Sequence, residues 1–169
     1  MFERFPRLYT PRLILRKLEV EDIPSLLQQA NNPKIADRIV NIPYPYEEPT
    51  AVFRLSYVVQ GFKNKSRYVF AMISKEREHL IGEISLHILE KDKLGEIGYW
   101  LGEDFWGQGL TSEAVAAITT FAFTEIGLTS LTATTNQDNL ASMRVLEKAG
   151  FTRIGQKGKL WQYVLENQS

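Results

Sequence analysis

The sequence contains no cysteine and only two histidines, His79 and His87. The lack of cysteine excludes disulfides, thiolate metal sites and cysteine-based nucleophilic catalysis. Two histidines are too few for a histidine-rich metal centre, so we expect no bound metal ion. We expect the histidines themselves to lie in a turn or on the surface of a sheet.

The sequence also lacks a net charge and a long apolar run. Its 20 basic residues balance its 20 acidic ones, so nothing attracts the whole protein to nucleic acid or to anionic membranes. No stretch reaches the apolar length that spans a bilayer, and the charged N-terminus MFERFPRLYT is unlike a signal peptide. We expect a cytoplasmic protein without nucleic-acid or membrane partners. The length predicts one domain over residues 1–169.

Short strand-like and helix-like segments fill the chain, without repeats or linkers. Strands are predicted over Arg12–Leu18, Tyr68–Ile73, Leu80–Leu89, Leu94–Leu101, Leu131–Thr135, Thr152–Ile154 and Trp161–Leu165. Helices are predicted after an Asp22 N-cap, after Asn31–Pro33, over Ala51–Phe62, between Leu110 and Gly127, and over Leu140–Ala149. Turns are predicted at Lys75–Glu78 and Glu90–Lys93, and a proline-containing loop at Asn41–Pro49. Antiparallel strands before βα units predict a layered α+β fold.

Two of these helices have recognisable apolar stripes. The spacing in the helix over Ala51–Phe62 predicts that its inner face carries Val52, Leu55, Val59 and Phe62. In the helix that ends at Gly127, the predicted inner face carries Ala114, Val115, Ile118, Phe121 and Ala122.

A glycine-containing loop joins the strand that ends at Leu101 to the helix that follows. Its sequence is Trp106-Gly107-Gln108-Gly109-Leu110-Thr111-Ser112-Glu113. Such a junction aims free N–H groups and the positive end of a helix dipole at one point, which suits a pyrophosphate. An ordinary turn is the alternative. A P-loop is disfavoured because no lysine follows Gly109, and the spacing of a Rossmann loop is incomplete.

A second strand-to-helix junction holds Asn139 and Ser142. Asn139 can serve as an N-cap that accepts a hydrogen bond from the first turn. Because both strands lead into helices from the same sheet edge, the two helix N-termini are predicted to flank one cleft.

The motifs as a set resemble the GNAT acetyltransferases, and within them the RimJ/RimL-like branch of ribosomal-protein N-terminal acetyltransferases. They are Thr10–Arg16, Glu21-Asp22, Gly95–Leu101, Trp106–Ala114, Asn139–Ser142 and Glu147–Phe151, in this order along nearly the whole chain. The loop departs from the common pattern, since Trp106 stands where Arg or Gln is usual and Thr111 where Gly or Ala is usual. The segment after Phe151 is also short, whereas the family often carries a longer hairpin with substrate-site residues there.

This resemblance implies a three-layer domain around a mostly antiparallel mixed sheet that splays into a V, with acetyl-CoA in the gap. The gap would open between the strands at Glu96–Leu101 and Leu131–Thr135. The residues implied to bind acetyl-CoA are Tyr99, Trp100, Leu101, Gly107, Gln108, Gly109, Leu110, Thr111, Ser112, Asn139 and Ser142. Arg144 and Lys148 are candidates for contacts with its phosphates, or are simply solvated.

The reaction implied is direct attack of a neutral amine on the thioester, which needs no cysteine. Ser142 is the candidate that protonates the departing sulfur. Glu96 is the candidate base, directly or through a water, because strand alternation places it on one face with Gly98 and Trp100. Glu83 is a second candidate, and an exposed strand glutamate is the alternative for either residue.

The acceptor predicted from these features is a primary amine, and more specifically the N-terminal α-amine of a protein or peptide. Tyr44, Tyr46 and Phe62 are candidates for the acceptor pocket, although aromatic residues at such positions often belong to the core. Acetylation of a small amine, such as an antibiotic or polyamine, stays open, as does a non-catalytic module that binds CoA. The protein is expected to be a monomer or a homodimer.

Overall fold

The computed structural model describes residues 3–89 and 93–168. Its centre is an eight-stranded sheet in the order β1-β2-β3-β4-β5-β6-β8-β7. The strands are β1 (Leu8–Tyr9), β2 (Leu13–Lys17), β3 (Arg67–Ser74), β4 (Leu80–Leu89), β5 (Leu94–Leu101), β6 (Ser130–Asn136), β7 (Thr152–Lys157) and β8 (Leu160–Glu166). Only the β5–β6 pair is parallel among these. The predicted α+β fold with a mostly antiparallel mixed sheet is confirmed.

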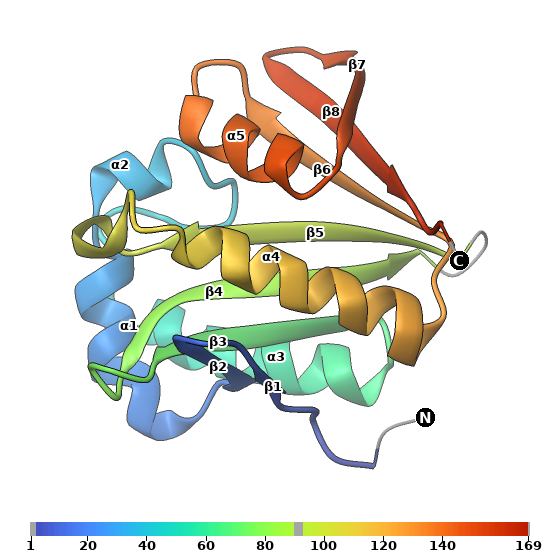
Figure 1. Cartoon of the computed structure of the whole chain (residues 1–169). Coiled ribbons are helices and arrows are strands. Elements are labelled where there is room, and N and C mark those ends of the chain that lie inside the picture. Colours follow the sequence, from blue (N-terminus) through green and yellow to red (C-terminus); the bar gives the residue numbers. More distant parts are fainter. Residues whose placement is uncertain (1–2, 90–92, 169) are drawn as a thin grey trace.

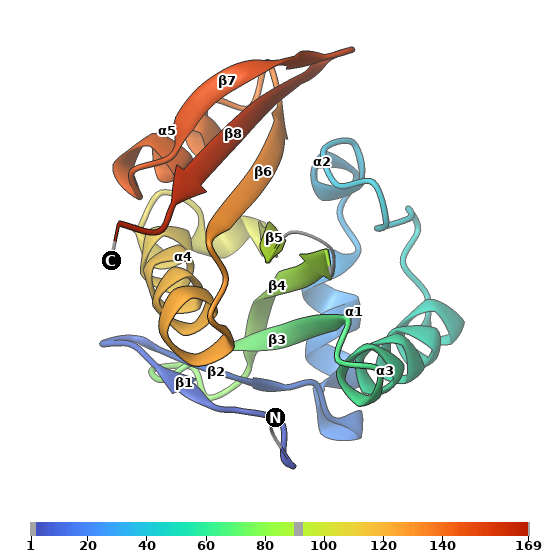
Figure 2. The same cartoon turned by 90° about the vertical axis from the view of Figure 1, so that its right-hand side faces the viewer.

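Helices cover both faces of this sheet (Figures 1 and 2). They are α1 (Ile23–Ala30), α2 (Pro33–Ala36), α3 (Glu48–Lys63), α4 (Leu110–Thr120) and α5 (Leu140–Lys148), with short turns η1 (Val20–Asp22), η2 (Glu103–Phe105) and η3 (Phe121–Ile126). Figure 2 shows α4 on one side of strands β2–β5 and both α1 and α3 on the other. No helix among the described residues is long and apolar enough to cross a bilayer.

Each helical layer closes its own apolar core. The stripe predicted for α4 and η3 is fully buried, and it packs against Leu15, Phe70 and Ile84 of the sheet. The helix ends at Gly127, as predicted, with φ of +85°. On the opposite face, Val69 and Ala71 of β3 pack against α1 and α3.

The predicted V-shaped opening is present between β5 and β6. The two strands pair only at Leu94–Glu96 of β5 and at Ser130–Thr132 of β6. Beyond Glu96 the strands separate, while β6 continues in a ladder with β8 to Asn136. In Figure 1 α4 follows β5 and α5 follows β6, so both helices begin at the open end of this V.

The apolar face predicted for α3 is only half correct, since Leu55 and Phe62 pack against the cores and the other two residues do not. Val52 and Val59 are each 48% exposed, whereas the residues that face the sheet include Ala51, Val58 and Gly61. The inner face also carries Arg54, which forms an ion pair with the buried Glu83. The helix therefore turns a charged residue inward, which a purely apolar pattern does not anticipate. It also begins at Glu48, inside the segment predicted to be a loop.

Asp22 does not cap α1 with its side chain, in contrast to the prediction. It is buried and accepts hydrogen bonds from the guanidinium of Arg16 at 2.8 and 2.9 Å and from the N–H of Glu19. Its carboxylate thus joins β2 to η1. The predicted turn at Lys75–Glu78 is present, while the turn at Glu90–Lys93 lies, apart from Lys93, outside the described residues.

Candidate functional site

The loop before α4 presents unpaired backbone donors. Gly107 and Gly109 have φ of +76° and +81°, a conformation that glycine adopts without strain. No side chain caps the helix at Gly109. Among the described residues, the N–H groups over 107–112 have no protein acceptor. These amides and the positive end of the α4 dipole can therefore bind an anion.

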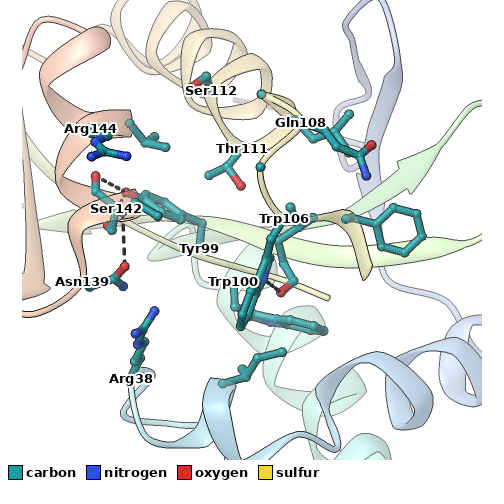
Figure 3. A pocket seen from close by; sticks show the side chains of 18 of the residues that line it. Arg38, Tyr99, Trp100, Trp106, Gln108, Thr111, Ser112, Asn139, Ser142 and Arg144 are labelled. Atoms are coloured by element: carbon teal, nitrogen blue, oxygen red, sulfur yellow. Dashed lines mark hydrogen bonds between the residues drawn. The ribbon is translucent and has the colours of Figure 1, made fainter. Parts of the chain in front are cut away.

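This loop forms one wall of a cleft of about 330 Å³, which we call the first cleft (Figure 3). Every residue that the resemblance implies for the cofactor lines it, from Tyr99 to Ser142. Three basic residues also line it, Lys34, Arg38 and Arg144, and none of its described lining residues is acidic. Lys34 is held by Glu103 at 2.7 Å. The charge of the cleft suits a polyanion.

The edge of β5 forms another wall of the first cleft. The N–H of Gly102 donates to the carbonyl oxygen of Ile81 on β4 at 2.8 Å, so the main-chain groups of every second residue before Gly102 also point toward β4. By the alternation of an antiparallel ladder, the main-chain groups of Tyr99 and Leu101 point away from β4, into the V. The indole Nε1 of Trp106 donates to the carbonyl of Leu101 at 2.7 Å and so holds the loop against the strand. An extended ligand can therefore form hydrogen bonds with Tyr99.

The start of α5 faces Tyr99 across the V (Figure 3). The Oδ1 of Asn139 accepts a hydrogen bond from the N–H of Ser142 at 3.2 Å, so Asn139 does cap the helix. The hydroxyl of Ser142 lies 2.8 Å from the hydroxyl of Tyr99. Burial raises the pKa of Tyr99 to about 12, while the hydrogen bond with Ser142 opposes this. The phenol therefore stays protonated and can donate to the Ser142 Oγ, which leaves the Ser142 proton free for another acceptor.

Comparison with known proteins assigns the family. Residues 12–152 match the model of the acetyltransferase (GNAT) domain. N-acetyltransferase p20 of Bacillus licheniformis is 30% identical over 154 residues, which covers 88% of this chain and 83% of that protein. A ribosomal-protein-serine acetyltransferase of Escherichia coli is 52% identical over 48 residues, 28% of this chain and 26% of that protein. Among solved structures, RimL, a ribosomal L7/L12 α-N-protein acetyltransferase in complex with coenzyme A, superposes with a TM-score of 0.84 at 21% identity, covering 97% and 98% of the two chains.

The chain belongs to the GNAT acetyltransferase family. It is an acetyl-CoA-dependent N-acetyltransferase, which confirms the prediction of an enzyme that acetylates amines. The first cleft fits CoA in three respects: free amides over 107–112, basic residues without acidic neighbours in the lining, and an unpaired strand edge. A CoA pyrophosphate would be held by the amides, and its pantetheine arm by the edge of β5.

A second cleft of about 240 Å³ meets the first across β5. The residues that line both clefts are Arg38, Ile39, Tyr99, Trp100, Asn139 and Ser142. The second cleft continues over the opposite face of the sheet, where Ser85 lies opposite Gly98. It thus opens at the GNAT thioester position expected near Tyr99 and Ser142, and it is the candidate site of the amine.

The two candidate bases of the GNAT site differ in their surroundings. Glu83 is 3% exposed, and its two oxygens accept hydrogen bonds from Trp100 Nε1 at 2.8 Å and from Arg54 Nε at 3.3 Å. A carboxylate with both oxygens engaged is a poor proton acceptor, so Glu83 holds Trp100 in place. Glu96 is exposed in the second cleft and makes no hydrogen bond or ion pair within the described chain. It is free to receive a proton.

The aromatic residues predicted for the acceptor pocket do not line either cleft. Tyr46 is buried in the core between α1 and α3, and Phe62 packs on Phe5 and Tyr68. Tyr44 is exposed outside both clefts. These side chains were candidates because of their residue type, but Tyr46 and Phe62 belong to the cores, which was the stated alternative, and Tyr44 lies outside both clefts.

Several residues that line the clefts were not predicted from the sequence, and Lys34, Arg38 and His87 are examples with ionisable side chains. Lys34 and Arg38 reach the first cleft from α2 and the turn after it, and His87 lines the second cleft from β4. Isolated charges in a helix and a lone histidine in a strand carry no local signal for a site. Of the two basic residues proposed near the phosphates, Arg144 lines the first cleft and Lys148 does not.

We predict that Ser142→Ala lowers turnover less than about tenfold and leaves the fold intact. A thiol has a pKa of roughly 8.5, so its thiolate departs tolerably without help. The cap on α5 uses the N–H of Ser142 and the side chain of Asn139, and both remain in the variant. Steady-state rates and the acetyl-CoA-induced shift in melting temperature test this. If the rate and the acetyl-CoA affinity both stay unchanged, the role of Ser142 is limited to its backbone.

Proposed function

We propose that this enzyme transfers the acetyl group to the N-terminal α-amine of a protein or peptide, by direct attack of the amine on the thioester. The observation that carries the proposal is that the second cleft has little free negative charge. Of its two acidic residues, Glu83 is engaged by Arg54 and Trp100, which leaves Glu96. One exposed carboxylate suits an amine that is partly neutral at the working pH.

The ordinary pKa values of amines distinguish the acceptors. An α-amine has a pKa of roughly 7.7–8.0, against about 10.4 for a lysine side chain. A lysine is almost wholly charged at neutral pH and demands a stronger base. A polyamine would favour several acidic side chains around its further charges. The solved RimL structure and the E. coli relative both carry names of ribosomal-protein acetyltransferases, which also supports an N-terminal acceptor.

The residues of the chain have distinct tasks in this proposal. Acetyl-CoA supplies an activated acetyl group that an amine can take without a covalent enzyme intermediate. One backbone N–H at the free edge of β5, between Tyr99 and Leu101, binds and polarises the acetyl oxygen. Ser142, oriented by Tyr99, donates its proton at the sulfur. Glu96 accepts the proton of the incoming ammonium through a water.

Glu96→Gln is expected to reduce turnover most at low pH. The loss of a general base costs about 100-fold at pH 6.5. Alkaline pH restores much of the rate because the α-amine then deprotonates without help. The measurement is kcat between pH 6 and pH 9.5 with a saturating peptide. A ratio of wild-type to variant rate that stays constant with pH would contradict the assignment of Glu96 as a base.

A panel of matched peptides tests the acceptor. Each peptide is offered with a free or a blocked N-terminus, with and without lysine, and the products are identified by mass spectrometry. We expect acetylation at the free N-terminus and little at lysine. Efficient acetylation of blocked peptides that contain lysine, or of small amines alone, would reject the α-amine acceptor.

A further inference from the structure

A row of ionisable side chains crosses the sheet along one side of the second cleft. In the register of β3, β4 and β5, Arg67 lies opposite His87, and His87 lies opposite Glu96. Residues directly opposite in a ladder project from the same face, so the side chains of His87 and Glu96 are neighbours. The next row toward the open end of the V is Ser85 and Gly98. The two ionisable groups therefore lie beside an uncovered part of the sheet.

His87 is a half-buried histidine that lines the cleft and has no structural task. Its imidazole makes no hydrogen bond with the described part of the chain. The other histidine, His79, lies near a different cleft, and its Nδ1 is 3.0 Å from the carbonyl oxygen of Leu80. Only His87 is therefore placed to exchange a proton with a bound amine.

Burial and two neighbouring guanidinium groups keep the imidazole of His87 neutral at pH 7. Burial lowers the pKa of His87 below its ordinary value of 6.5, and the guanidinium groups of Arg67 and Arg54 lower it further. The groups that face it are Arg67 from β3, Glu96 from β5, and Arg54 and Tyr57 from α3. A neutral imidazole can accept a proton, whereas an imidazolium cannot.

Both cations are fixed by partners other than His87. The guanidinium of Arg67 stacks 3.6 Å from the ring centroid of Tyr57 and donates to the Tyr57 carbonyl at 3.0 Å. Arg54 is paired with Glu83. Arg38, which also lines the second cleft, is exposed and lies on the turn after α2, outside this row of strand residues. The positive field at His87 is thus built into the sheet and α3.

We propose that His87 is a catalytic residue, and that His87 and Glu96 together form the proton acceptor for the amine. This inference rests on the proposed function, which it deepens. In this pair the imidazole takes the proton of the substrate ammonium, in place of a transfer through water to Glu96 alone, and the carboxylate of Glu96 opposite stabilises the resulting imidazolium. The freed lone pair forms the C–N bond as the C–S bond breaks. The remaining excess proton passes through Ser142 to the sulfur, and the imidazolium later releases its proton to solvent.

The kinetic test compares His87→Gln, Glu96→Gln and the double variant with wild type. We expect His87→Gln to lose about 100-fold in kcat at pH 6.5 and less than about tenfold at pH 9.5. Because the two residues act as one unit, the kcat of the double variant should be only slightly lower than the kcat of the less active single variant. His79→Gln is the matched control and should keep the wild-type rate and pH profile.

A second readout does not depend on turnover. With only two histidines in the chain, NMR titration of the intact protein follows both rings, and His79→Gln identifies the signal of His87. We expect the pKa of His87 to lie below 6.5 and to fall further in Glu96→Gln, since an anion that favours the imidazolium has been removed. Melting shifts with acetyl-CoA establish that each variant is folded.

Three results would overturn the proposal. The first is a kcat of His87→Gln that equals that of wild type at every pH. The second is a loss of kcat in His87→Gln by the same factor at every pH. The third is a pKa of His87 that does not change in Glu96→Gln. Failure of the proposed function is a separate outcome: wild type would then acetylate no peptide N-terminus, whatever the titration of His87 shows.

Discussion

Gly109→Pro abolishes the stabilisation of this protein by acetyl-CoA. At a ligand concentration 100 times the Kd, wild type should gain about 2.7 kcal/mol in the free energy of unfolding. Gly109 has φ of +81°, whereas proline is restricted to φ near −65°. The substitution also removes one of the free N–H groups before α4. The loop must therefore change its path, and the amides at 107–112 no longer converge. Thermal melts with and without acetyl-CoA measure the effect.

A matched pair of variants separates loss of binding from loss of stability. Gly109→Ala and Gly127→Ala place alanine at nearly the same backbone angle, φ of +81° and +85°, at opposite ends of the α4–η3 helix. Each should cost about 1–2 kcal/mol in stability. Only the variant at Gly109 should bind acetyl-CoA more weakly. A Gly109→Pro protein that keeps the full melting shift would show that the CoA phosphates bind elsewhere.

Gly98→Val removes acetylation of the acceptor without removing acetyl-CoA binding. Gly98 lines the second cleft but not the first, between Glu96 and Trp100 on the same face of β5. An added Cβ would lie 3.4 Å from the Ser85 Oγ and within 4 Å of no other described heavy atom beyond its chain neighbours. The strand can therefore carry valine, but its methyl groups occupy the position where the amine must approach.

The expected loss in kcat/KM for the acceptor exceeds about 100-fold, since even a 1 Å displacement of reacting atoms can cost about 100-fold. The melting shift with acetyl-CoA should match that of wild type. Gly155→Val is a suitable control, because Gly155 is a strand glycine on β7 with one side-chain atom 3.6 Å from its added Cβ and no place in either cleft. Normal turnover in Gly98→Val would place the acceptor outside the second cleft.

The segments whose signals are local could be predicted from the sequence. The predicted strands, the buried stripe of α4, its end at Gly127 and the cap at Asn139 lie where their patterns indicate, whereas the two-residue strand β1 was not predicted. The glycine loop before α4 was also recognisable, because glycines at a strand-to-helix junction allow backbone angles that leave N–H groups open to an anion. These features were sufficient to reach the family, whose motifs are concentrated at the two junctions.

The polar side of the site was decided by the tertiary structure. Arg54 faces inward on α3 because Glu83, 29 residues later on β4, is buried opposite it, and a buried carboxylate requires such a partner. No pattern within α3 contains that information, so the apolar stripe predicted there was wrong at Val52 and Val59. Tyr46 likewise lies in a core because neighbours from other elements enclose it.

His87 shows most clearly what could not be predicted from the sequence. In the sequence it is a lone histidine in a strand, for which a surface position is a reasonable prediction. Its place between Arg67 and Glu96 follows from the registers of three strands, and its lowered pKa follows from burial and from two guanidinium groups on different elements. The sequence by itself determined the fold, the family and the loop that suits a pyrophosphate, since each depends on local backbone and apolar patterns. The protonation states of the residues in the second cleft, and the side chains that surround them, depend on distances between segments far apart in the chain. Only the tertiary structure brings those segments together.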